Sequence, residues 1–321
     1  MNLLVLLLAV LVSPAASGTG VEVRDGGTQL AIELDPALRR DANGDPWREW
    51  MRTALQAAAT ATGDYPRERI VVDLRAAPSA HRTIAFGQIR RERPPRIVFW
   101  VDPEADLDSL RADWRSYHEF AHLLIPFPGN RDIWFTEGFA SYYQYILQSR
   151  AGLITAREAW TRLMAGFRRG VRDPAGRGRS LRELSPAMWR EDAFRRVYWT
   201  GAAFFLRVDV RLRVESGGAQ SLDRALARFH DCCLGDQRRW RAADLVERLG
   251  QLSIASIWRD EYRRMIDQPA EPDLGPVLAL LGISAGKTSP VFSEAPAERM
   301  LRQAIAGPHD TGRDQESGGP L

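Results

Sequence analysis

The stretch YHEFAH at residues 117–122 constrains this chain more than any other part of its sequence. An α-helix completes a turn every 3.6 residues, so His118 and His122 would project from one face about a turn apart. Two imidazoles at this spacing can bind one zinc ion. Glu119 would lie beside that ion and could take a proton from an activated water molecule. The motif therefore predicts a zinc-binding helix with two histidine ligands and a glutamate base.

A zinc site of this kind needs a third protein ligand and an open position for water. Pro128 stands six residues after His122, where the metzincin pattern would require a histidine. The segment WFTEGFASYY at 134–143 offers Glu137 instead, near the start of the next predicted helix. The intervening loop is long enough to bring this helix against the first one. We therefore expect Glu137 to be the third ligand.

The composition is that of an ordinary globular protein. Of the 321 residues, 26% are charged and 45% are hydrophobic, and the formal net charge is only +3. Lys287 is the only lysine, and the arginines are scattered along the chain. Because there is no run of five or six like charges and no nucleic-acid-binding motif, nucleic acid is not an expected partner.

The N-terminus has the pattern of an export signal. Residues 3–12 form an apolar run that is too short to span a bilayer comfortably, and small residues follow between 13 and 17. The basic segment that usually precedes such a run is missing. We expect residues 1–17 to be a cleaved signal peptide, with a retained anchor or a buried element as the alternatives. The protein would then be periplasmic or secreted, with no stable membrane span after cleavage.

Hydrophobic periodicity divides the remaining chain into two subdomains. Residues 18–107 predict a small mixed layer, with a hairpin at 21–34, a helix from 46 to about 63, and strands at 69–74, 83–89 and 96–101. Residues 108–285 predict a mostly helical subdomain, which begins with one helix from about 109 to 125. Residues 286–321 are expected to form a disordered tail. The expected fold class is α+β, with the zinc helix between the two subdomains.

Cys232 and Cys233 are the only cysteines, and they are adjacent. Neighbouring residues seldom reach disulfide geometry, and the pair lacks the spacing of zinc ligands. We therefore expect two free thiols at a half-buried helix end.

Three motifs in order resemble the gluzincin metallopeptidases. They are HEFAH, then WFTEGFASYY, then VYWTGAAFFLRVDVRLR at 197–213 followed by QSLDRAL at 220–226. The likeness is to the catalytic domain of the glycyl aminopeptidase family and, more distantly, to aminopeptidase N, and it covers about residues 110–285. It implies a thermolysin-like zincin fold and a peptide or protein substrate.

The same resemblance implies roles for particular residues. One Zn²⁺ per chain would be held by His118, His122 and Glu137, with Glu119 as the general base. Tyr198 matches the tyrosine that donates a hydrogen bond to the tetrahedral intermediate. We also expect a neighbouring side chain to orient a ligand histidine by a hydrogen bond, and Ser141 is predicted for this role because it follows Glu137 by one turn.

The segment before the zinc helix departs from the family pattern. AFGQIRRERPP at 85–95 lacks the glycine-and-glutamate motif with which aminopeptidase N holds a free amine, and its only acid is Glu92. The first prediction is therefore an exported zinc endopeptidase or a peptidase of narrow specificity. An aminopeptidase of the glycyl type is the second, and a zinc-stabilised binding or scaffold protein is the third. The strand at 96–101 is predicted to pair with an extended peptide.

Overall fold

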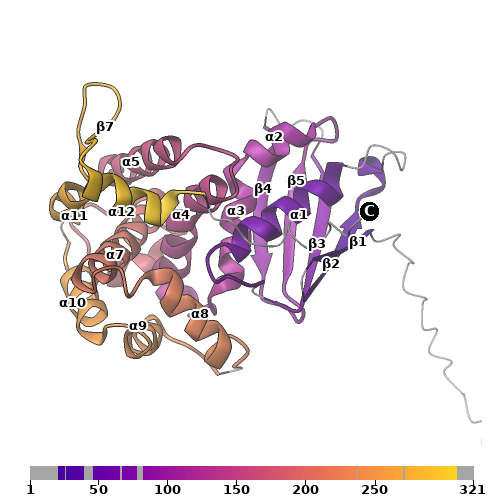
Figure 1. The fold of residues 1–321 in the computed structure, drawn as a ribbon. Helices are drawn as coiled ribbons and strands as arrows, with labels where there is room; N and C mark the ends of the chain where they lie inside the picture. Colours follow the sequence, from indigo (N-terminus) through magenta and orange to yellow (C-terminus); the bar gives the residue numbers. More distant parts are fainter. Residues whose placement is uncertain are drawn as a thin grey trace, which may run out of the picture.

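The protein is an α+β molecule in which a mixed sheet and a helical layer meet at one helix, as expected from the sequence. Figure 1 shows the sheet on one side, most helices on the other, and α3 (Trp114–Ala121) between them. Among the described residues, no helix has the length and apolar character needed to cross a membrane. The predicted signal peptide lies outside the described residues. The computed structural model describes residues 21–25, 27–39, 46–65, 67–77, 82–236, 238–269 and 272–308.

The sheet has five strands in the order β1-β2-β3-β5-β4. These are β1 (Val21–Asp25), β2 (Thr28–Leu34), β3 (Arg69–Ala76), β4 (Ile84–Arg90) and β5 (Arg96–Val101). The expected hairpin is formed by β1 and β2, and β2, β3 and β5 run parallel. β3 and β5 carry nearly continuous apolar runs, which is typical of strands covered on both faces.

The edge strand beside the zinc helix is β4, which pairs antiparallel with β5. β5 therefore has a neighbour on each side, β3 and β4. The prediction that residues 96–101 offer a free edge to a peptide is wrong for this reason. The order of strands along the chain did not reveal this arrangement, because β4, which comes first in sequence, takes the edge position and β5 then lies between β3 and β4.

Helix α1 (Pro46–Ala59) lies across the sheet and helps to fix α3 (Figure 1). Trp50 packs its ring 5.2 Å from that of Phe99 on β5 and donates its indole N–H to Ser116 on α3 at 2.9 Å. A buried tryptophan needs such an acceptor, because an unpaired indole N–H would lose its hydrogen bond to water. The zinc helix is thus tied to the sheet through α1.

The helix predicted from 109 to 125 is broken into three pieces: α2 (Leu107–Ala112), α3, and a 3₁₀ turn at His122–Leu124. Asp113 ends α2 and caps α3, and its carboxylate accepts the backbone N–H of Arg115. The expectation of one continuous helix is wrong, because a capping side chain here competes with the helix interior. The break precedes His118, and His122 keeps helical backbone angles, so the one-turn spacing survives.

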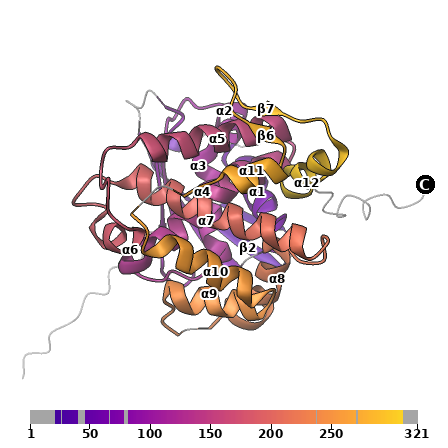
Figure 2. The ribbon, with the colours of Figure 1, turned by 90° about the vertical axis from the view of Figure 1, so that its left-hand side faces the viewer.

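Helices form most of the rest of the described chain, and α4 and α7 lie at the centre (Figure 2). α4 is buried on nearly all sides, as expected for a central helix. The helices are α4 (Ile133–Arg150), α5 (Ala156–Arg172), α6 (Leu181–Leu184), α7 (Phe194–Glu215), α8 (Leu222–Cys233), α9 (Ala242–Gln251), α10 (Ala255–Ile266), α11 (Gly275–Leu280) and α12 (Pro296–Ala306).

Glycines bring α4 and α7 into backbone contact. A β-carbon at Gly138 of α4 would lie 2.4 Å from the Cα of Gly201 on α7, and one at Gly201 would lie 2.4 Å from the carbonyl oxygen of Trp134. Only residues without a side chain permit this approach. It matters for the site because Glu137 directly precedes Gly138, and Tyr198 lies about one turn before Gly201.

The predicted disordered tail is wrong as far as residue 308. A short hairpin, β6 (Ile283–Ser284) and β7 (Val291–Phe292), is followed by α12, whose Ile305 and Ala306 are buried. Arg150 at the end of α4 donates to the carbonyl of Ile305 at 2.9 Å. The amphipathic pattern of α12 favours a packed helix more strongly than the surrounding prolines and glycines favour disorder. Residues 309–321 lie outside the described residues.

The expectation of free thiols is also wrong, because Cys232 and Cys233 form a disulfide with their Cα atoms 3.7 Å apart. The sequence rule is a tendency, and adjacent cysteines can still join where regular structure stops. Cys233 is the last residue of α8.

Candidate active site

His118, His122 and Glu137 meet between α3 and α4. The Nε2 atom of His118 lies 3.2 Å, and that of His122 3.6 Å, from the same carboxylate oxygen of Glu137. The three possible ligand atoms all lie within 4.8 Å of one another. Two imidazole nitrogens and one carboxylate oxygen form the ligand set of a catalytic zinc site that keeps a position open.

Hydrogen bonds at the far side of each imidazole turn the Nε2 atoms toward this centre. Nδ1 of His118 lies 3.0 Å from the amide oxygen of Gln144, which can only accept, so the proton of that ring is on Nδ1. Nδ1 of His122 lies 2.9 Å from the hydroxyl of Thr136. The Gln144 oxygen thus fixes the tautomer of His118 that leaves Nε2 free for a metal, and Thr136 fixes the orientation of the His122 ring.

The prediction that Ser141 orients a histidine is wrong, because Gln144 and Thr136 occupy both Nδ1 atoms. Gln144 follows Glu137 by seven residues and therefore shares its helical face. Its polar side chain in a helix that is otherwise mostly apolar was the signal available in the sequence. Thr136 had no such signal, since its role depends on how the 3₁₀ turn meets α4.

The charges within the cluster favour a cation at its centre. Burial lowers the pKa of His122 to about 3, so this imidazole is neutral at pH 7. Burial would raise the pKa of Glu137, but His122, His118 and Tyr198 together lower it to about 2. Burial also opposes charge on His118, yet its pKa is raised, because the hydrogen bonds to Glu137 and Gln144 and the charges of Glu119 and Glu137 together outweigh that effect. Positive charge between His118 and Glu137 is therefore stabilised.

Glu119 is buried between the zinc helix and β4. A β-carbon at Gly87 would lie 2.9 Å from Cγ of Glu119, so this part of β4 can approach only because the residue is glycine. The backbone N–H of Ile89 donates to the Glu119 carboxylate. Burial raises the pKa of Glu119 to about 7, although the nearby His118 opposes the shift. A carboxylate with this affinity for protons suits a general base.

Tyr198 reaches the cluster from α7. Its ring stacks on that of His118 with the centroids 5.9 Å apart, and its hydroxyl donates to the Glu137 carboxylate. Burial and the neighbouring Glu137 raise the pKa of Tyr198 well above its usual value, so the hydroxyl keeps its proton. The five residues singled out from the sequence thus lie together in space.

Arg91 is a site residue that the sequence did not reveal. It follows β4 and donates to the backbone carbonyl of His122 at 3.0 Å and to the hydroxyl of Thr136 at 3.3 Å. Its guanidinium lies 5.3 Å from the centroid of the Phe127 ring. Burial lowers the pKa of Arg91 to about 10, which still leaves it charged at pH 7. No signal distinguished it within an arginine-rich stretch.

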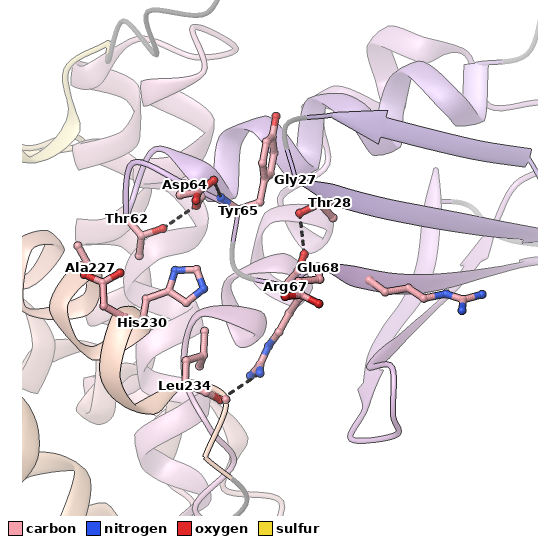
Figure 3. Close-up of a pocket in the computed structure, with 13 residues that line it drawn as sticks. Gly27, Thr28, Thr62, Asp64, Tyr65, Arg67, Glu68, Ala227, His230 and Leu234 are labelled. Atoms are coloured by element: carbon pink, nitrogen blue, oxygen red, sulfur yellow. Dashed lines mark hydrogen bonds between the residues drawn. The ribbon is translucent and has the colours of Figure 1, made fainter.

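Of the other histidines, only His230 lies among the described residues, and it does not join this cluster. His230 borders a separate cleft of about 600 Å³ between the sheet and α8, where Figure 3 also shows Thr62 and Arg67. None of the five candidate residues lines this cleft. Within the described part of the chain, the cluster of His118, His122 and Glu137 is the one group of three residues that could hold a metal. His81 and His309 lie outside the described residues.

Comparison with known sequences agrees with the motifs. The family model of the M61 glycyl aminopeptidases matches residues 128–202, a segment that includes Glu137 and Tyr198. No curated protein sequence matches the chain significantly. The match begins after the two histidines, so their place in the site depends on the geometry described above.

Solved structures share the fold at low sequence identity. An aminopeptidase N family protein from Idiomarina loihiensis superimposes with a TM-score of 0.61 and 16% identity, over 83% of this chain and 49% of that one. An M1 zinc metallopeptidase from Deinococcus radiodurans gives a TM-score of 0.50 and 16% identity, over 79% and 52%. A mutant M1 zinc metallopeptidase from the same organism, bound to a Tyr-Ser-Ala substrate, gives a TM-score of 0.50 and 17% identity, over 79% of this chain and 52% of that one.

The chain spans about half the length of these proteins. At this identity the likeness establishes the shared fold, and the family model adds the second sequence motif and the beginning of the third. Together they show that the chain resembles the glycyl aminopeptidase family among the gluzincin peptidases.

Proposed function

We propose that this protein is an exported zinc-dependent peptidase that cleaves internal peptide bonds. The observation that carries the proposal is the convergence of two imidazole nitrogens and a carboxylate on one point, with Glu119 and Tyr198 beside it. The ligand set fits zinc, because Gln144 holds His118 in the required tautomer and Thr136 orients the ring of His122. The apolar N-terminal run, followed by small residues, supports export.

A zinc ion held by His118, His122 and Glu137 would supply Lewis acidity, which lowers the pKa of water from near 16 to about 7. Glu119 accepts a proton from the attacking water and later donates it to the leaving amine. Tyr198 donates its hydroxyl hydrogen to the oxygen on which negative charge develops. Glu119 is buried and Tyr198 is partly buried, which limits the access of other water to these transfers.

The edge of β4 is the proposed binding surface for an extended substrate. Its free side offers backbone N–H and C=O groups with which a peptide can pair as an additional strand. The close approach of Gly87 to Glu119 places this edge next to the general base. A peptide bound there would present a bond from the middle of its chain to the site.

The charges near the site favour an endopeptidase over an aminopeptidase. Glu92 is the acid of the segment 85–95 that precedes the zinc helix, and its carboxylate is paired with Arg96 at 3.2 Å. Arg91 places a buried positive charge beside the ligands, and a like charge disfavours a free amine in the same region. The match to the glycyl aminopeptidase model keeps an aminopeptidase as the second candidate.

A peptide-library digestion read by mass spectrometry tests the proposal. Native protein should produce internal cuts, and these should disappear with Glu119→Gln and after removal of metal by a chelator. If the library peptides instead lose residues one by one from their N-termini, the protein is an aminopeptidase and the proposal is wrong. Cleavage that persists in both controls would show that this site is not the catalyst.

Tyr198→Phe is expected to lower kcat on the order of a hundredfold, with a smaller change in KM. The reason is that the hydroxyl donates to an oxygen whose negative charge is largest in the transition state. Steady-state kinetics on a peptide from the digestion measures this. An unchanged kcat would remove Tyr198 from the mechanism.

Gln144→Leu is expected to weaken zinc binding about 10- to 100-fold, because His118 loses the acceptor that fixes its ring and tautomer. Competition with a metal-binding dye measures the affinity. Ser141→Ala is the matched control, one turn nearer to Glu137 on the same helix and without a bond to either histidine ring. Equal affinities for the two variants would contradict the role of Gln144.

A further inference from the structure

The disulfide between Cys232 and Cys233 contributes little to the stability of the fold as a covalent cross-link. A disulfide stabilises a fold mainly by closing a loop of the unfolded chain, and the effect grows with the length of that loop. The cysteines are adjacent, so the loop closed here is the shortest possible. Another role for the pair is therefore indicated, and its surroundings suggest one.

Arg248 on α9 contacts both sulfur atoms. Its Nε–H points at Sγ of Cys233 at 3.2 Å, and one of its terminal N–H groups points at Sγ of Cys232 at 3.3 Å. Its other hydrogen bond goes to the side-chain oxygen of Gln251 at 3.3 Å. Among the described residues, no carboxylate lies within salt-bridge distance of Arg248. A neutral disulfide gains little from such a cation, whereas a thiolate gains a great deal.

The two sulfurs differ in their access to solvent. Cys232 is exposed, while only 8% of Cys233 is exposed. Both border a cleft of about 440 Å³, which is also lined by Arg238, Trp240, Arg248 and the acidic Asp236, Asp244 and Glu247. An incoming thiol can therefore reach Cys232 first, and the sulfur left behind is the one beside the Nε–H of Arg248.

We propose that Cys232 and Cys233 form a thiol–disulfide exchange site that accepts electrons from a dithiol reductant. A thiolate of the reductant attacks Sγ of Cys232, a mixed disulfide forms, and the bond to Cys233 breaks. The electron pair of that bond stays on Cys233, whose thiolate is stabilised by Arg248. The second thiol of the reductant then attacks the mixed disulfide and releases Cys232. The pair has gained two electrons and, after protonation, two protons, while the reductant leaves as a disulfide.

The test is the rate of reduction of the full-length protein by dithiothreitol without denaturant. Samples are quenched with an alkylating agent and weighed by mass spectrometry. The chain has only two cysteines, so every label reports on this pair. We expect complete reduction, and recovery of the disulfide when oxidised dithiothreitol replaces the dithiol as the electron acceptor. The rate of reduction should be about 3- to 10-fold lower in Arg248→Gln, because the leaving thiolate is less stabilised.

Two further variants separate this role from a general effect on folding. Arg248→Lys keeps a cation and should recover part of the lost rate. Arg259→Gln removes an exposed arginine from α10, whose Nε–H donates to the backbone carbonyl of Ala255, and should react like the native protein. Reduction only after unfolding would overturn the proposal, and so would a rate that does not depend on Arg248. These outcomes do not depend on the peptidase activity.

Discussion

Glu119→Gln is expected to lower kcat by about 10²- to 10⁴-fold while the zinc content stays unchanged. The amide has nearly the same shape as the carboxylate but cannot take up a proton from water. The proposed metal ligands are His118, His122 and Glu137, and none of them is altered. The loss should therefore appear in kcat, with little change in KM.

Steady-state kinetics and metal analysis of the same preparations measure the effect. Glu158→Gln is the matched control, because it makes the same change at a surface helix start where the carboxylate contacts Arg162. It should change kcat by less than about twofold, as expected for a surface position away from the site. A fall in zinc content in Glu119→Gln would mean that Glu119 helps to hold the metal. Full activity would mean that another group is the base.

Gly138→Ala is expected to destabilise the fold and to reduce activity together. The added β-carbon would meet the backbone of Gly201 at 2.4 Å, where no flexible side chain can give way. Forcing an atom into such a contact costs about 1–3 kcal/mol or more. The helices must separate, which moves Glu137 on one and Tyr198 on the other. A displacement near 1 Å can cost about a hundredfold in rate.

Denaturant unfolding followed by circular dichroism gives the change in the free energy of unfolding, and kinetics on the folded fraction gives the change in rate. Gly27→Ala is a suitable control, since a β-carbon there would meet nothing within 4 Å. It should be close to the native protein in both measurements. Native stability and activity in Gly138→Ala would show that α4 and α7 do not need their close approach.

The parts of the site that could be predicted from sequence are those set by local geometry. His118 and His122 are one helical turn apart, and this spacing holds even though the helix changes to a 3₁₀ turn at His122. Glu137 and Tyr198 were found from the order of motifs around them. The mixed sheet with α1 followed from alternation, apolar runs and capping residues, which are also local.

The parts that could not be predicted depend on contacts between distant segments. The strand order places β4 at the edge of the sheet, and no local pattern distinguishes this edge strand from the interior β5. Arg91 reaches His122 and Thr136 only because the end of β4 lies over the zinc helix. Residues 296–306 likewise fold as the helix α12 because they pack against α4 and α5, and composition cannot reveal this packing.

The sequence by itself therefore determined which residues have the chemistry of a zinc peptidase, because ligand type and helical spacing are properties of short segments. Only the tertiary structure decided how these residues are held. Gln144 and Thr136 orient the imidazoles, glycines allow α4 and α7 to touch, and Arg248 contacts the disulfide. Each of these contacts joins elements whose packing depends on the whole chain, and periodicity within one segment carries no information about it.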